Sequence, residues 1–172
     1  MSETDEALAD AMAERTYRAI GRFIFEFSQA EWRIRTVLAS EIGLKDEFFS
    51  IVIESYDVAM LCNVAKAVFA KSRSQTNAAK IIALINDFFD LNLHRNRVAH
   101  GVWVPFREGG IVHNVPRTSL KPVAYSNQAA SLEKLADNAS SLRFRLEEAC
   151  WFGGSGRKRA PATQLRLTEG PR

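Results

Sequence analysis

The sequence predicts an all-α protein, a bundle of four to five helices with a small β-hairpin inserted before the last helix. Apolar residues recur at helical spacing over long stretches of the chain. Two short β-branched and aromatic runs flank a glycine-containing turn late in the sequence. The 172 residues, 47% of them hydrophobic, suffice for one buried core and are few for two. We therefore expect a single domain.

The first helix is predicted from Thr16 to Leu38. Its apolar positions fall on one side, at Tyr17, Ile20, Ile24, Phe27, Ile34 and Leu38. Glu31 lies on the same stripe, where a carboxylate is costly unless it is paired. We expect Glu31 to meet a cation, and Arg95, Arg97 and His100 are the candidates. The alternatives are another cation or a position at the edge of the stripe, open to solvent.

Gly43 is expected to end this helix, because glycine adopts the left-handed conformation of a helix C-terminus without strain. Residues 45–53 and 57–71 then have helical patterns of their own. They form either two helices, with Ser55 as a possible N-cap between them, or one kinked helix.

The next helix is predicted to begin at Thr76 and to stop at Gly101. Its apolar residues are Ile81, Ile82, Ile85, Phe88, Phe89 and Leu93. Residues 102–106 and 111–115 follow on either side of a turn, which predicts a short hairpin at an edge. Residues 122–125 are a candidate third strand.

The last helix, capped by Ser126 or Asn127, is predicted to end at Phe152. Its apolar positions are Leu132, Leu135, Ala139, Leu142, Leu146 and Cys150. Residues 153–172 have too few apolar side chains to offset the entropy of ordering, so we expect a disordered basic tail. Residues 1–15 are an acidic lead-in, and residues 16–152 form the helical domain.

The formal net charge of +3 comes from the tail, since residues 153–172 carry +4 and the rest of the chain carries −1. The body is therefore not basic, and its charge gives no argument for nucleic-acid binding. The two cysteines and three histidines are scattered, so neither a disulfide framework nor a metal or other cofactor is predicted. No apolar run reaches the roughly 20 residues of a membrane span, and no signal-peptide layout is present. We expect a cytoplasmic protein.

The segment Arg95–Gly101 has the pattern of a catalytic site. Arg95 can bind a phosphate in a bidentate fork, and His100 can transfer protons near neutral pH, which suits phosphodiester cleavage without a metal. On an unbroken helix the two side chains lie roughly 140° apart, so either the helix ends early or two copies of the chain cooperate. Asn96 shares a face with His100 and is placed to hold its tautomer. Alternatively, Arg95 and His100 are ordinary helix-end cations.

This segment, with Trp103 after it, resembles the signature of HEPN domains, the all-α family named for higher eukaryote and prokaryote nucleotide-binding proteins. In that signature Arg precedes His by four to six residues, and a polar residue such as Asn96 often follows the Arg. Phe27–Trp32 is similar to part of the first long helix of bacterial HEPN-like proteins. The resemblance covers residues 17–152. Some HEPN toxins accept adenylyl groups on a tyrosine two residues after the motif histidine, where this chain has Val102.

The resemblance implies a metal-independent endoribonuclease, a toxin or defence RNase, whose composite site joins Arg95 and His100 of two protomers in a homodimer. His100 would act as general acid or base and Arg95 would stabilise phosphoryl charge, leaving 2′,3′-cyclic phosphate and 5′-hydroxyl ends. Asn96, Arg97 and Glu31 would support them. The implied partners are RNA, a second copy, and an antitoxin or other protein. The alternatives are a catalytically silent HEPN-like module that binds a protein or nucleotide, and an antitoxin or immunity-type protein.

Overall fold

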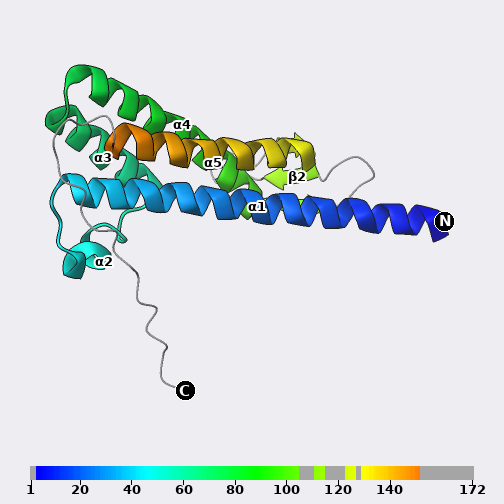
Figure 1. Ribbon diagram of the computed structural model, residues 1–172. Coiled ribbons are helices and arrows are strands. Elements are labelled where there is room, and N and C mark those ends of the chain that lie inside the picture. The colour runs from blue at the N-terminus through cyan, green and yellow to red at the C-terminus, as the bar shows by residue number, and fades with distance from the viewer. Residues whose placement is uncertain (1–2, 105–110, 115–122, 127–128, 152–172) are drawn as a thin grey trace.

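The computed structural model describes residues 3–104, 111–114, 123–126 and 129–151, and the predicted all-α bundle is confirmed (Figure 1). Its elements in chain order are α1 (Glu3–Glu41), the short 3-10 helix η1 (Asp46–Phe48), α2 (Phe49–Val52), α3 (Val58–Ser72), α4 (Gln75–His100), β1 (Val102–Val104), β2 (Ile111–Asn114), β3 (Val123–Ser126) and α5 (Ala129–Trp151). Helices α1, α3, α4 and α5 form the bundle, and α2 is a single turn at one end of it. No helix in the described part is long and apolar enough to cross a membrane.

Helices α1 and α5 lie side by side and run in the same direction (Figure 1). Their ion pairs advance along both helices together: Arg15–Glu133 at 3.1 Å, Arg22–Asp137 at 2.5 Å and Arg33–Glu147 at 3.5 Å. Helix α4 runs in the opposite direction and packs against both of them, and α3 packs against α4. The end of α4 that carries Arg95–Gly101 therefore lies near the start of α5.

The core is built from apolar side chains of all four long helices. Phe23 and Phe27 of α1, Phe69 of α3 and Phe88 of α4 are completely or almost completely buried. The rings of Phe27 and Phe88 stack at 4.8 Å between centroids with an angle of 17° between their planes. This stack fixes α4 against α1 about four turns before the end of α1 and places the last turns of α4 beside it.

Helix α1 begins at Glu3 rather than at Thr16, so the acidic lead-in is helical from Glu3 onward. Alanine and glutamate have high helix propensity, and extending an existing helix needs no new nucleation step. Residues 4–11 are exposed, and this stretch extends beyond the rest of the bundle in Figure 1. Phe27, Ile34 and Leu38 of the predicted stripe are buried, but Tyr17 is 61% exposed, and the buried face also includes Ala19, Phe23 and Ala30.

The region after α1 contains separate short elements rather than one kinked helix. Gly43 has a φ of 66°, as predicted for the residue that ends α1. The N-cap of α3 is Asp57, whose carboxylate accepts a hydrogen bond from the Met60 backbone N–H at 2.7 Å. Ser55 is not the cap, because its hydroxyl donates to the Val52 carbonyl oxygen at 3.0 Å. A hydroxyl engaged with the preceding turn cannot accept from the next helix in the same way.

Three short strands follow α4 and form an antiparallel sheet in the order β1-β2-β3. Val102 pairs with His113 and Val104 with Ile111, and β2 pairs with β3 with His113 opposite Ala124. Ser126, a predicted cap of the last helix, instead ends β3, and Asn127 lies outside the described residues. The predicted basic tail, residues 153–172, also lies outside them.

Candidate functional site

The predicted catalytic segment forms the last two turns of α4. The helix is unbroken through His100, and the Gly101 N–H donates to the Arg97 carbonyl oxygen at 3.0 Å. Gly101 ends the helix as predicted, with an extended backbone (φ −84°, ψ 153°). Because the helix does not end early, Arg95 and His100 stay roughly 140° apart around its axis. A single protomer therefore does not present both side chains to one phosphate.

Arg95 lies on the side of α4 that faces α1. Its guanidinium carbon is 5.9 Å from the centroid of the Phe27 ring, within the range of a cation–π contact. Its Nη1 donates to Asn96 Oδ1 at 3.1 Å. Phe27 is itself held by its stack on Phe88. The half-buried Arg95 is therefore supported on two sides, and Asn96 supports the arginine of the motif rather than holding the imidazole.

His100 is the last residue of α4 and is exposed. The side chains that precede it on the same face are also open to solvent: Phe89 is 36% exposed and Leu93 is 47% exposed. Both belonged to the predicted buried stripe of this helix. Ile81, Ile85 and Phe88 of that stripe are buried as predicted, whereas Phe89 and Leu93 lie at its outer edge, beyond the face that packs on the bundle. An apolar strip thus leads along α4 to His100.

Glu31 does not meet the motif, and its partner is the cation one turn further along α1. Arg35 Nη2 lies 2.5 Å from Glu31 Oε1 and also donates to the Tyr56 carbonyl oxygen at 2.8 Å. Arg35 Nη1 donates to the carbonyl oxygen of Ile53. Arg35 is only 9% exposed. The acidic residue on the apolar stripe therefore belongs to a clamp that holds the α2–α3 connection on α1.

Arg97 is exposed on α4, and its charge acts on a neighbour in the sequence. Burial and, to a smaller extent, Arg97 lower the pKa of the His94 imidazole, against the raising influence of Asp90. His94 therefore stays mainly neutral at neutral pH. Unlike His100, it faces α5.

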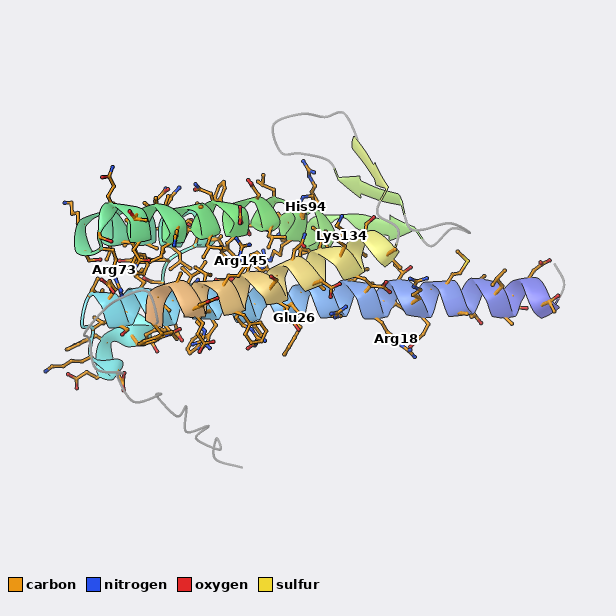
Figure 2. All side chains as sticks on the ribbon, turned by 45° about the horizontal axis from the view of Figure 1, so that its top comes forward. Arg18, Glu26, Arg73, His94, Lys134 and Arg145 are labelled. Carbon is orange, nitrogen blue, oxygen red and sulfur yellow. The ribbon has the colours of Figure 1, made fainter. Side chains whose placement is uncertain are left out.

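A groove of about 330 Å³ runs between α4 and α5 at His94. Figure 2 shows His94 on α4 and Arg145 on α5, where these helices run next to each other. The groove is lined by Asp87, Asp90, Leu91, His94, Leu135, Asn138, Ser141, Leu142 and Arg145. Sequence reasoning missed it, because the lining comes from two helices far apart in the chain. The available signal was the recurrence of polar residues at spacings of three and four on both helices.

The two cysteines are unsuited to nucleophilic chemistry. Burial raises the pKa of Cys62 to about 11 and that of Cys150 to about 12, so both stay protonated at neutral pH. In the described part of the chain, no three histidine, cysteine, aspartate or glutamate side chains come together as metal ligands would.

Comparison with known proteins adds no relative to this picture. The chain matches no protein-family model, no curated protein and no solved structure.

Proposed function

We propose that this protein is a metal-independent endoribonuclease of HEPN type that acts as a homodimer, in the role of a toxin or defence RNase. The observation that carries the proposal is the placement of Arg95 and His100 at the open end of α4, with Arg95 held by Phe27 and Asn96. An anchored guanidinium and an exposed imidazole are the two groups that phosphodiester cleavage needs. Their spacing is that of the HEPN signature.

The reaction is an internal transesterification of RNA. One His100 removes the proton from a 2′-hydroxyl, whose oxygen forms a bond to the adjacent phosphorus. The bond from phosphorus to the 5′-oxygen breaks, and the protonated His100 returns its proton to that oxygen. Arg95 stabilises the negative charge that develops on the phosphoryl oxygens. The products are a 2′,3′-cyclic phosphate and a 5′-hydroxyl, and no water is consumed.

The exposed strip on α4 supports the role of a second copy. Phe89, Leu93, Asn96 and His100 follow one another at spacings of four, three and four, so they lie on one face. Two large apolar side chains beside a catalytic candidate are what a dimer interface would cover. A two-fold axis beside the last turn of α4 would bring the helix ends of two protomers together and supply the group that each lacks.

A catalytically silent binding module is the second candidate, and one observation favours it. Arg95 packs over a core phenylalanine and binds its own neighbour, which are contacts that a purely structural arginine would also make. In that case Arg95 would join α4 to α1, and the exposed face of α4 would bind a protein partner or a nucleotide.

Cleavage of RNA in excess EDTA separates the two candidates. Wild-type protein should cleave and leave 2′,3′-cyclic phosphate ends, whereas His100→Ala and Arg95→Ala should each lose at least about a hundredfold in rate. Arg18→Ala is the matched control, because Arg18 is an exposed arginine of α1 far from the motif in sequence, and it should cleave like wild type. Absence of cleavage by folded wild-type protein on every RNA class tried would favour the silent module.

Mixing the two inactive variants tests the composite site. If Arg95 of one protomer works with His100 of the other, a heterodimer of Arg95→Ala and His100→Ala keeps one intact pair. After subunit exchange, activity should recover to about a quarter of the wild-type level, because about half of the dimers are mixed and each has half of its pairs intact. Mixtures that stay as inactive as the separate variants would show that one protomer supplies both groups.

A further inference from the structure

The groove between α4 and α5 has an apolar floor and a polar rim. Leu91 and Leu142 are buried beneath it, and Leu135 is half-buried beside them. The rim is formed by Asp87, Asp90, His94, Asn138, Ser141 and Arg145. A volume of about 330 Å³ is at the small end of ligand sites. This combination fits a small flat ligand whose faces are apolar and whose edges form hydrogen bonds.

The charge of the rim selects among such ligands. Asp87 is balanced by Arg145, whose Nη1 lies 3.8 Å from Asp87 Oδ2. Asp90 is exposed, and none of the ion pairs among the described residues includes it, although its charge acts on the His94 imidazole. His94 stays mainly neutral, so it does not balance that carboxylate. The rim therefore has a net negative charge, which disfavours a phosphate and favours an edge that donates hydrogen bonds.

We propose that the α4/α5 groove binds one guanine base of single-stranded RNA, with the Asp90 carboxylate accepting hydrogen bonds from its N1–H and 2-amino groups. The proposal rests on the proposed function, because it takes RNA as the substrate. Guanine alone among the four bases presents two adjacent donors on its Watson–Crick edge, and a carboxylate accepts both at once. The Asn138 amide, across the groove on α5, is placed to donate to the guanine O6. Contact of the base with the apolar surface of Leu135 and the exposed edge of Leu91 adds affinity that does not depend on sequence.

The position of the groove connects it to the catalytic candidates. His94 is the residue before Arg95 and lies about 9 Å before His100 along the axis of α4. A short stretch of unpaired RNA spans that separation. A guanine held in the groove would therefore set which phosphate lies at the end of α4, and the enzyme would cut near guanines.

Binding to short RNAs tests the proposal without cleavage. The His100→Ala protein is titrated, with fluorescence anisotropy as readout, into uridine-rich oligonucleotides that carry one central guanosine, inosine or adenosine. The guanosine RNA should bind about tenfold more tightly than the adenosine RNA, with inosine between them because it lacks the 2-amino group. Introducing Asp90→Asn into the His100→Ala protein should reduce the preference for the guanosine RNA over the adenosine RNA to less than about twofold. Glu148→Gln, an exposed acid of α5 outside the groove, is the control and should keep it.

Equal affinities for the guanosine and adenosine RNAs, an unchanged preference in Asp90→Asn, or no binding of any of these RNAs would each overturn the guanine site. The cleavage assay keeps this separate from the proposed function. Cleavage by wild type without a preference for guanine rejects the groove and leaves the ribonuclease intact. Guanine-selective binding by a protein that does not cleave RNA rejects the ribonuclease and leaves the groove intact.

Discussion

Glu31 and Arg35, one turn apart on α1, form an ion pair of 2.5 Å whose guanidinium is largely shielded from solvent. The same guanidinium binds the carbonyl oxygens of Ile53 and Tyr56, so a single side chain joins α1 to the chain before α3. Helix α1 also contains a second Glu–Arg pair at the same spacing, Glu14–Arg18, which is exposed. The two pairs differ in burial and in what else the arginine binds.

Arg35→Ala should therefore destabilise the protein far more than Arg18→Ala. Loss of Arg35 leaves a partly buried carboxylate and two carbonyl oxygens without their donor, at a cost of about 3 kcal/mol. Loss of Arg18, whose side chain points away from the bundle in Figure 2, should cost less than about 0.5 kcal/mol. Urea unfolding followed by circular dichroism measures both. Equal losses would mean that the Arg35 clamp contributes no more than a surface pair.

Asp57→Ala should cost about 1 kcal/mol of unfolding free energy, because the Met60 N–H loses its acceptor at the start of α3. Ser55→Ala is the matched control, since the Ser55 hydroxyl is exposed and binds only a carbonyl of the preceding turn. It should change stability by less than about 0.5 kcal/mol. The same urea titrations decide between them, and a larger loss in Ser55→Ala would return the capping role to the serine.

Leu93→Glu should convert a dimer into a monomer. Light scattering on wild-type protein should give twice the chain mass of 19.3 kDa, and the variant should give the chain mass itself with an unchanged circular dichroism spectrum. The reason is that a charge in the middle of an apolar interface is costly to desolvate. Ile51→Glu, at a residue of α2 that is 71% exposed, adds the same charge at the other end of the bundle and should leave the dimer intact. A monomeric wild-type protein would contradict the proposal that two protomers share one catalytic site.

The free energy of unfolding should fall as the pH drops below the ordinary pKa of histidine, 6.5, partly because of His94. Its pKa is lowered in the folded state by burial and by Arg97, so the unfolded chain takes up the proton first. Stability is then lost between pH 6.5 and the lower pKa of the folded state. His94→Gln should flatten this part of the pH dependence, measured by urea unfolding across that range. Arg97→Gln should flatten it less, and parallel curves for wild type and His94→Gln would contradict the assignment.

The sequence by itself determined the class of the fold and the ends of several helices. Helical periodicity over long stretches predicted the bundle, and Gly43 and Gly101 were placed at helix ends because glycine punctuates helices locally. The motif on α4 could also be identified from the sequence, since Arg95, Asn96 and His100 lie within six residues of one another. These are properties of one segment at a time.

Only the tertiary structure decided which faces of the helices are covered and which side chains meet. Tyr17, Phe89 and Leu93 fit a buried stripe by spacing alone, yet they are exposed, because the neighbouring helices cover a face turned slightly away from them. Glu31 pairs with Arg35 rather than with a cation of the motif, although either cation would neutralise its carboxylate. The groove at His94 exists because α4 and α5, which are far apart in the chain, pack beside each other. Packing depends on many small contacts between segments that are distant in the chain. Local sequence patterns therefore do not predict which helix faces become covered.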